Sequence, residues 1–306
     1  MSVYVFGHKS PDTDSVAAAI AYAALMKGKG EDFVPVIQGK ANPETAMVLS
    51  RFGFAVPEMM TDAAGKKIAL VDHSDLAQAP DNIASAELVG VVDHHKIGDV
   101  TTNSPIFFFN MPVGCSCTVM KTLYDMEGVK VDAKVAGLML AAILSDTVNF
   151  KSPTCTEADK KAVKALAAIA GVTDTDGLFM DMLKAKSAVA GVPPMELLHR
   201  DYKDFDMKGK KVGVGQLELA TLEQVADMRD ALYAAMKQQK GSERHSVLLM
   251  LTDVVKEGTD LLVLSDEPAI IEGAFGKKLS GNSMWIDGMM SRKKQTIPNL
   301  QKAFGC

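Results

Sequence analysis

The first half of the chain alternates short apolar runs with long alanine-rich segments, and this alternation restricts the possible folds more than any other feature. The apolar runs Val3 to Phe6, Lys67 to Val71 and Leu88 to Val92 have the length of buried strands, and each stops at polar residues. The alanine-rich segments have helical composition and spacing; they are Ser15 to Lys27, Pro43 to Arg51, Thr118 to Tyr124 and Ala133 to Leu144. The pattern predicts an α/β fold with a mostly parallel sheet and helices on both of its faces.

The second half predicts a smaller α/β domain. Two more helical segments, 156–170 and 175–186, precede a stretch from Ala188 to Pro194 that combines small residues with Gly191 and two prolines, which is typical of a linker. Beyond it lie apolar runs at 211–217, 246–252 and 261–264 and a helical segment at 221–239. We therefore expect domains at residues 1–187 and 195–306, joined by a linker at 188–194.

Charge and composition exclude several classes of protein. The chain has 33 Lys and Arg against 38 Asp and Glu, a net charge of −5, without long basic blocks, so nucleic acid is not an expected partner. No apolar run approaches the ~20 residues that span a bilayer, and the N-terminus lacks a signal-peptide pattern. We therefore expect a soluble, cytoplasmic protein with no membrane partner. Cys115 and Cys117 are expected as small buried residues in a tight turn, with a redox pair as the alternative.

Acidic and histidine residues cluster where the predicted strands end. The first cluster is His8-Lys9-Ser10-Pro11-Asp12-Thr13-Asp14, which lies between the first strand and the first long helix. Open α/β sheets place their sites in such loops, at the carboxyl ends of parallel strands. Either aspartate could instead cap the helix, but capping does not explain His8.

Three further clusters follow apolar segments in the same way. Asp72 ends one strand, Asp93-His94-His95 end another, and Asp146 follows the apolar helical run 137–144. A single histidine is more often structural than a ligand, but two adjacent histidines after an aspartate favour a site. We expect the clusters to meet at one edge of the sheet.

Carboxylates and imidazoles without cysteine suit Mn²⁺, Mg²⁺ or Co²⁺ better than a structural zinc ion. Five or six such ligands exceed what one ion needs. Two ions that share a carboxylate, ~3.5–4 Å apart, are the recurring arrangement in enzymes that hydrolyse phosphoryl compounds. The sequence therefore predicts a two-metal hydrolase.

These motifs, in this order, resemble those of the DHH phosphoesterase superfamily. Near the C-terminus, Ser291-Arg292-Lys293-Lys294-Gln295 resembles the SRKKQ motif of family II, manganese-dependent inorganic pyrophosphatases, whose second domain is of the DHHA2 type. The resemblance covers essentially the whole chain. It implies that residues 1–187 are the DHH metal-binding catalytic domain, that 195–306 are a DHHA2-type substrate-binding domain, and that the protein is a homodimer through the N-terminal domain.

The same resemblance implies a role for each site residue. One Mn²⁺ would be held by His8, Asp12 and Asp72, and a second by Asp14, Asp72, His94 and Asp146, with Asp72 as the bridge. Substrate would be contacted by His95, Lys203, Ser291, Arg292 and Lys293, with a solvated surface lysine as the alternative for Lys203. Asp93 would orient the His94 ring from outside the ligand set.

The implied activity is that of an inorganic diphosphatase. A hydroxide shared by the two ions would attack one phosphorus in line, while Lys203, Arg292 and Lys293 stabilise the departing phosphate and His95 supplies a proton or hydrogen bond. Co²⁺ or Mg²⁺ could replace Mn²⁺, and an additional Mg²⁺ would arrive with pyrophosphate. The two domains would close over the substrate.

The sequence departs from the family pattern at one place, and it leaves two alternative functions to be tested. Asp72-His73-Ser74-Asp75 stands where the family has Asp-His-Asn-Glu, which places the hydrogen bonds around the ligands in doubt. Relatives that cleave oligonucleotides or nucleoside phosphates typically carry a GGGH motif, which the C-terminal half lacks. A non-catalytic metal- or phosphate-binding module is the alternative from another class.

Overall fold

The structure is a computed structural model that describes residues 2–306 and divides the chain after Lys186 into two compact units. The predicted linker, 188–194, lies at the start of the second unit: Val189 is buried in that unit's core, and Pro194 begins helix α7 (Pro194–His199). Within residues 2–306, none of the helices combines the length and the apolar character that a membrane crossing requires.

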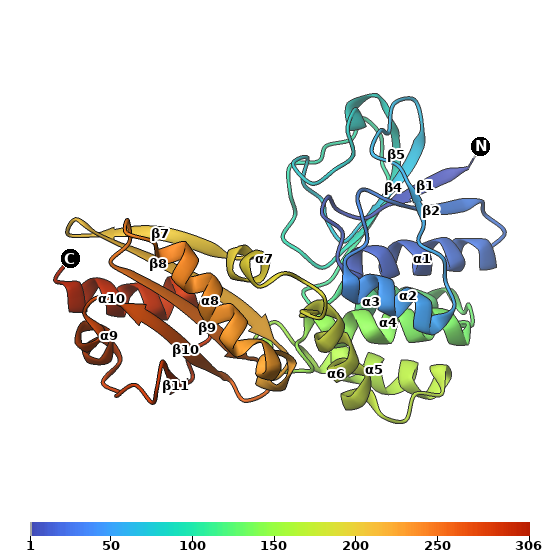
Figure 1. The fold of residues 1–306 in the computed structure, drawn as a ribbon. Coiled ribbons are helices and arrows are strands. Elements are labelled where there is room, and N and C mark those ends of the chain that lie inside the picture. The colour runs from blue at the N-terminus through green and yellow to red at the C-terminus, as the bar shows by residue number, and fades with distance from the viewer. Residues whose placement is uncertain (1) are drawn as a thin grey trace. The chain divides into compact units, whose positions relative to one another are not determined.

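The first unit is built on a six-stranded sheet whose neighbouring strands are all parallel (Figure 1). Its order is β3-β2-β1-β4-β5-β6, so the chain runs outward from β1 in one direction and from β4 in the other. The strands are β1 (Val3–Phe6), β2 (Phe33–Ile37), β3 (Glu58–Met59), β4 (Lys67–Val71), β5 (Glu87–Asp93) and β6 (Phe107–Asn110). The point between β1 and β4, where the order reverses, is where open α/β sheets bind their ligands.

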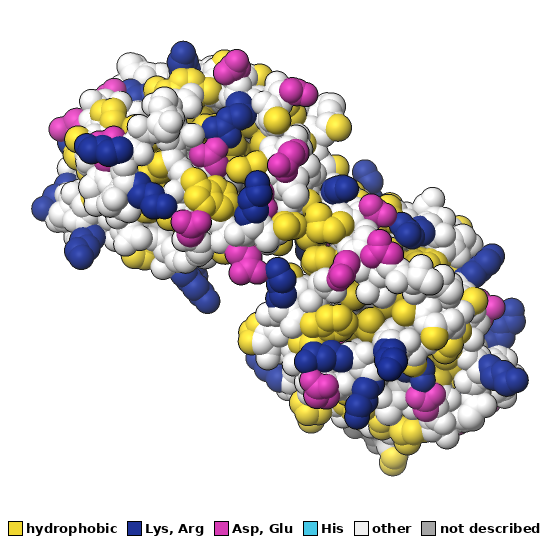
Figure 2. Space-filling model, turned by 90° about the horizontal axis from the view of Figure 1, so that it is seen from below, with side chains coloured by type: hydrophobic (Ala, Val, Ile, Leu, Met, Phe, Trp, Pro, Cys, Tyr) yellow, Lys and Arg dark blue, Asp and Glu magenta, His cyan; other side chains and the backbone are white. Residues whose placement is uncertain are grey.

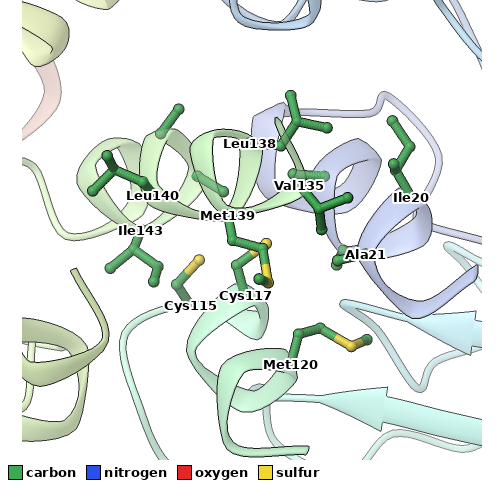
Figure 3. Close-up of a cluster of buried hydrophobic side chains, with 14 of the residues drawn as sticks. Ile20, Ala21, Cys115, Cys117, Met120, Val135, Leu138, Met139, Leu140 and Ile143 are labelled. Atoms are coloured by element: carbon green, nitrogen blue, oxygen red, sulfur yellow. The ribbon is translucent and has the colours of Figure 1, made fainter. Parts of the chain in front are cut away.

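The α-helices of this unit pack on one face of the sheet, where they form its largest core. They are α1 (Thr13–Gly28), α2 (Pro43–Phe52), α3 (Ser116–Glu127), α4 (Ala133–Asp146), α5 (Glu157–Ala170) and α6 (Thr175–Lys186). Helix α4 lies between other helices and is buried without a break from Val135 to Leu144, which explains its almost wholly apolar sequence. Figure 3 shows Cys115 and Cys117 beside Met139 and Ile143 of α4, as small buried thiols in the core.

The opposite face of the sheet has a different cover from the one predicted. Phe6, Ile68 and Leu70 are buried there beneath loops and the 3₁₀ helix η1 (Ile83–Ser85), and no α-helix contributes to this core among the described residues. The physical reason lies in the connection between β4 and β5, residues 72–86, which carries site residues and holds only this short helical turn. The parallel α/β sheet is as predicted, but its α-helices lie on one face.

The second, smaller unit has a mixed five-stranded sheet of order β11-β10-β9-β8-β7, in which only β8 and β9 run parallel. Its strands are β7 (Tyr202–Met207), β8 (Lys210–Leu219), β9 (Ser246–Asp253), β10 (Gly258–Ser265) and β11 (Ser283–Asp287). Its remaining helices are the 3₁₀ helix η2 (Leu222–Met228), α8 (Arg229–Lys240), α9 (Pro268–Phe275), the π-helical turn η3 (Arg292–Thr296) and α10 (Ile297–Phe304). This confirms a second α/β unit.

Each face of the second sheet has its own core. Leu197 of α7 and Leu232 of α8 pack on one face, and Ile271 of α9 and Leu300 of α10 pack on the other. Figure 2 shows a face of the molecule on which Lys and Arg side chains are scattered among acidic and apolar ones, without a basic stripe.

Candidate metal centre

His8 follows β1 directly after Gly7 and points its outer ring nitrogen at two carboxylates. Its Nε2 lies 3.4 Å from Asp12 Oδ2 and 3.3 Å from Asp72 Oδ2. Its Nδ1 lies 2.8 Å from the Lys9 carbonyl oxygen, so an Nδ1–H donated to that carbonyl leaves the Nε2 lone pair facing the carboxylates. This is the tautomer that a metal-binding histidine needs.

Asp12 and Asp14 lie at the start of α1, and each accepts backbone hydrogen bonds at a helix start while it also belongs to the cluster. Asp12 caps the helix by accepting a hydrogen bond from the Ser15 N–H at 2.9 Å, while its other oxygen faces His8. Asp14 is fully buried, and its two oxygens accept the N–H groups of Ser116 (2.6 Å) and Cys117 (3.0 Å) at the start of α3. Capping and a place in the site are therefore compatible, because a carboxylate has two oxygens.

Asp72 occupies the centre of the cluster. It follows β4 with a φ of +63°, a left-handed conformation that a non-glycine residue rarely adopts and that is common at functional sites. Its Oδ2 faces His8, whereas its Oδ1 lies 3.4 Å from His94 Nε2 and accepts a hydrogen bond from Ser116 Oγ at 2.9 Å. The two oxygens thus face two different imidazoles, which is the arrangement that a bridging carboxylate requires.

The Asp93-His94-His95 segment lies at the end of β5, and the hydrogen bonds of its side chains differ from one prediction. The Nδ1 atom of His94 lies 2.9 Å from the Val113 carbonyl oxygen, so that carbonyl, and not Asp93, fixes the orientation of the His94 ring. Asp93 Oδ1 instead accepts the backbone N–H groups of both histidines and lies 3.0 Å from His95 Nδ1. We predicted that Asp93 orients His94. Asp93 instead orients the half-exposed His95 ring, because the chain turns after Asp93 and places the ring of His95, two residues later, beside the Asp93 carboxylate.

Asp146 is the last residue of α4 and joins the cluster from the helical layer. Donor atoms that lie within 4.8 Å of one another form three connected groups: His8 with Asp12 and Asp72; Asp14 with His94 and Asp146; and Asp72 with His94 and His95. A fourth group of this kind combines Asp14 with the two core cysteines. The structure thus brings together every residue of the first unit that the sequence analysis proposed as a metal ligand.

The charges of this cluster are unbalanced without a cation. Burial, together with the charge of Asp72, raises the pKa of Asp14 to about 6. Burial and then the charges of Asp14 and Asp72 raise the pKa of Asp146 well above its ordinary value. Burial alone would lower the pKa of His94, but Asp72 and Asp14 outweigh it and raise that pKa to about 9.

His8 shows the same balance. Burial lowers its pKa, yet the hydrogen bonds with Asp12 and Asp72 dominate and raise it to about 11. Burial likewise opposes ionisation of Asp72, but the rings of His8 and His94 hold the pKa of Asp72 below its ordinary range. Protons on the imidazoles therefore provide the positive charge that this set of carboxylates demands, and divalent cations would supply it equally well. The donor set, oxygen and imidazole nitrogen throughout, fits Mn²⁺ or a similar ion.

Two supporting residues were missed by the sequence analysis. Glu44 of α2 is buried, and its Oε1 accepts hydrogen bonds from Thr13 Oγ1 (2.6 Å) and Ser145 Oγ (2.7 Å), so it ties the start of α1 to the end of α4. Ser116 donates to Asp72, and its position in the GCSC turn at a helix start was the available signal. Glu44 gave none, since an acidic residue in the first turn of a helix is ordinary.

The departure from the family pattern lies outside the ligand set. Ser74 Oγ accepts the Gly98 N–H at 2.9 Å and lies 3.4 Å from the Lys96 carbonyl oxygen. Asp75 contacts the Gln78 side chain at 3.4 Å. Ser74 therefore fixes the loop that follows His95, and the side-chain hydrogen bonds of both residues go to partners outside the predicted ligand set.

In the second unit, the Ser291–Gln295 segment forms the turn η3, and two of its side chains build the turn itself. Ser291 caps it by accepting the Lys294 N–H at 3.2 Å. Gln295 folds back so that its Oε1 accepts the N–H groups of Met290 (2.8 Å) and Ser291 (2.9 Å). Ser291, predicted to bind substrate, thus has a structural hydrogen bond here, and the turn presents Arg292 and Lys293 from a fixed backbone.

The basic residues of the second unit differ in their surroundings. Arg292 is largely buried and donates hydrogen bonds to Asp201 and to the Val214 carbonyl oxygen. Lys293 is exposed. Lys203 of β7 is also exposed and pairs in register with Val214, whose side chain belongs to the core beneath α10. Paired residues of antiparallel strands point to one face, so Lys203 belongs to the face from which α10 and η3 approach.

Family models match both halves of the chain. The DHH family N-terminal domain matches residues 2–143, and the DHHA2 domain matches residues 180–303. The two matches fall on the unit that carries the carboxylate and imidazole cluster and on the unit that carries η3.

Individual proteins match over almost their full lengths. A protein of Archaeoglobus fulgidus named "Probable manganese-dependent inorganic pyrophosphatase" is 54% identical, over 99% of this chain and 98% of its own. The "Manganese-dependent inorganic pyrophosphatase" of Methanothrix thermoacetophila is 47% identical, over 99% of this chain and 98% of its own. A crystal structure of a Methanococcus jannaschii protein assigned to the family II inorganic pyrophosphatases has a TM-score of 0.64 and 40% identity and covers all of both chains.

Proposed function

We propose how this chain, which belongs to the family II, manganese-dependent inorganic pyrophosphatases, hydrolyses pyrophosphate to two orthophosphates. The observation that carries the proposal is the position of Asp72, whose two oxygens face His8 on one side and His94 on the other. One carboxylate between two sets of donors supports a pair of adjacent cations. We therefore infer a metal-dependent inorganic diphosphatase that binds two ions in each chain.

The ligand sets follow from the donor groups. His8, Asp12 and Asp72 would hold one Mn²⁺, and Asp14, Asp72, His94 and Asp146 would hold the other; Co²⁺ or Mg²⁺ could substitute. When bound, such ions lower the pKa of a water to near neutrality and neutralise phosphate charge. The chain contributes fixed geometry: the carbonyls that contact His8 and His94 select the ligating tautomer, and the start of α3 holds Asp14 in place.

Substrate would be held by residues of both units. His95 is half-exposed, and Asp93 raises its pKa, so it can offer a proton or a charged hydrogen bond to a phosphate oxygen. Arg292 offers planar N–H donors, whereas Lys203 and Lys293 act as point charges on the departing phosphate, and Ser291 shapes the turn. Pyrophosphate is strongly anionic, and an additional Mg²⁺ would accompany it.

A comparison of substrates tests this function. Phosphate release would be measured from pyrophosphate, from a dinucleotide and from adenosine bisphosphate, each with added Mn²⁺. We expect rapid release from pyrophosphate alone. Faster release from the dinucleotide or the bisphosphate would favour a nucleotide phosphoesterase of the same superfamily, and no turnover of any substrate would favour a binding module.

We further propose that the two units act together on one pyrophosphate molecule, with the hinge where the first unit ends, at Lys186, just before the predicted linker 188–194. The proposal rests on the division of the chemistry, since the ligands lie in the first unit and the predicted phosphate-binding cations lie in the second. Small-angle scattering would compare the Mn²⁺-loaded protein with and without imidodiphosphate. We expect compaction, and an unchanged radius of gyration at saturation would contradict a closing movement.

A homodimer through the first unit is also proposed. Strand β6 lies at the edge of its sheet, and its Phe107 and Phe108 side chains are 44% and 41% exposed, which is unusual for phenylalanine. A second copy paired along this edge would cover them. Light scattering should give twice the chain mass, and a monomeric mass would refute the pairing.

A cytoplasmic location is proposed as well. It agrees with the cysteines, which are free thiols.

A further inference from the structure

Arg292 is held at both its backbone and its guanidinium. Its N–H donates to Gln216 Oε1 at 3.1 Å, and the Gln216 amide nitrogen donates to the Met290 carbonyl oxygen at 2.9 Å. Its Nη1 donates to the carbonyl oxygens of Asp201 and Val214, and its Nη2 donates to Asp201 Oδ1 at 2.6 Å. The side chain is only 10% exposed, so these bonds fix it largely out of water.

The donors that remain on Arg292 have a specific geometry. A guanidinium carries five N–H donors. The two Nη1 hydrogens and one Nη2 hydrogen serve Asp201 and Val214, so within residues 2–306 the Nε hydrogen and the second Nη2 hydrogen remain without an acceptor. These two lie side by side along one edge of the planar group, and such a fork matches two oxygens of a phosphate.

Asp201 is suited to set the orientation of this fork. It lies between α7 and β7, and its carbonyl oxygen also accepts the Gln216 N–H at 2.9 Å, which anchors its backbone to β8. Its carboxylate is 53% exposed and accepts one hydrogen of Nη2, the nitrogen whose second hydrogen belongs to the free fork. A neutral or truncated residue at this position would remove the charged hydrogen bond at Nη2 and leave only the bonds from Nη1 to two backbone carbonyls, so Arg292 would be held less firmly.

We propose that Asp201 is a positioning residue for phosphate binding: it holds Arg292 so that the Nε and Nη2 edge is presented to pyrophosphate. The proposal rests on the proposed function and deepens it. A positioned arginine does not lose its side-chain entropy when substrate binds, which favours affinity. A competing role is a latch, in which Asp201 occupies Arg292 until phosphate displaces it, and the two roles differ in the sign of the effect on affinity.

Steady-state kinetics with magnesium pyrophosphate separate the two roles. Asp201→Asn keeps the shape and removes the charge, and we expect it to lower kcat/KM about tenfold, mainly through a higher KM. Asp227→Asn, an exposed aspartate of the same unit, is the matched control and should behave as the wild type. A lower KM for Asp201→Asn would show a latch and overturn the proposal, as would kinetics equal to those of the control.

A double-mutant cycle shows whether Asp201 acts through Arg292. In an Arg292→Ala background, Asp201→Asn should change kcat/KM by less than about twofold, because the group that it positions is gone. A full tenfold loss in that background would instead show that Asp201 stabilises the unit or contacts substrate itself, and the proposal would fail.

A readout without turnover keeps the inference separate from the proposed function. The chain has few arginines, so the Nε–H signals of Arg51, Arg200, Arg229, Arg244 and Arg292 can be assigned by nuclear magnetic resonance. In the wild type, the Arg292 signal should be sharp and should shift when imidodiphosphate is added; in Asp201→Asn it should broaden by exchange. An Arg292 signal that is equally sharp in both proteins, or that ignores imidodiphosphate, refutes the positioning role. A wild type that fails to hydrolyse pyrophosphate refutes the proposed function instead.

Discussion

The protonated imidazoles of the site make a quantitative prediction about the metal-free protein. The pKa of His94 rises from 6.5 to about 9 on folding, because Asp72 and Asp14 outweigh the opposing effect of burial. A histidine whose pKa is raised by folding stabilises the fold fully below pH 6.5, and that stability is lost as the pH rises through 9. The difference of about 2.5 in pKa, at about 1.36 kcal/mol for each pKa unit, amounts to about 3 kcal/mol.

Most of this stability should disappear between pH 7 and pH 9. Over that range the contribution of His94 to the free energy of unfolding should fall by about 2 kcal/mol, since half of the folded molecules have lost the proton at pH 9. Asp14 titrates lower, near pH 6, so it contributes little in this window. In thermal unfolding, a loss of this size in a unit of this length lowers the Tm by roughly 4–8 °C.

The assay is urea or thermal unfolding in a chelator at several pH values for the wild type and for His94→Gln, which keeps a hydrogen-bond donor toward Asp72. The stability advantage of the wild type should shrink by about 2 kcal/mol from pH 7 to pH 9. His199→Gln, an exposed histidine that contacts the Gln239 amide, is the matched control and should keep the wild-type pH dependence. With saturating Mn²⁺ the trend should reverse, because fewer protons then compete for the ligands. A pH dependence that is the same in His94→Gln and wild type, without metal, would refute this reasoning.

Three substitutions test the surroundings of the site. Gly7→Ala would place its Cβ 2.0 Å from the hydroxyl of the third residue of α1. In urea unfolding it should destabilise the first unit by about 1–3 kcal/mol, and it should weaken Mn²⁺ binding. The control Gly273→Ala, whose Cβ meets nothing within 4 Å, should be neutral or slightly stabilising. Ser116→Ala removes a hydrogen bond to the Asp72 carboxylate, worth about 1.5–3 kcal/mol, and should weaken Mn²⁺ binding about tenfold or more by calorimetry; unchanged affinity would contradict that role. Arg292→Glu should raise the KM for pyrophosphate and reduce turnover, and unchanged kinetics would remove Arg292 from the substrate site.

Most of the predicted strands contain clear apolar runs, and two of the missed ones are instructive. Strand β2 carries Pro35 opposite Val5 of β1, and proline is rare within sheets because it cannot donate to the ladder. Strand β6 is an exposed edge of four residues, as long as β1, and its three consecutive phenylalanines were a signal that the sequence analysis did not use. The segment from Thr221 was predicted as one helix, but it begins as the 3₁₀ turn η2 before α8, a difference that local composition does not reveal.

Convergence of the site was predictable because parallel strands deliver their carboxyl ends to one edge. His8 and Asp72 follow β1 and β4, the two strands at which the sheet order reverses, so topology alone brings them together. The hydrogen bonds around them were not predictable, because they depend on side chains far apart in the sequence. Asp201 and Arg292, or Glu44 and Ser145, meet only after the whole unit has folded.

The most direct test of the two-ion site is an anomalous difference map from crystals grown with Mn²⁺. We predict two peaks in each chain, about 3.5–4 Å apart, with one oxygen of Asp72 coordinating each. His8 should coordinate one ion and His94 the other. A single peak, or two peaks with Asp72 coordinating neither ion, would contradict the account.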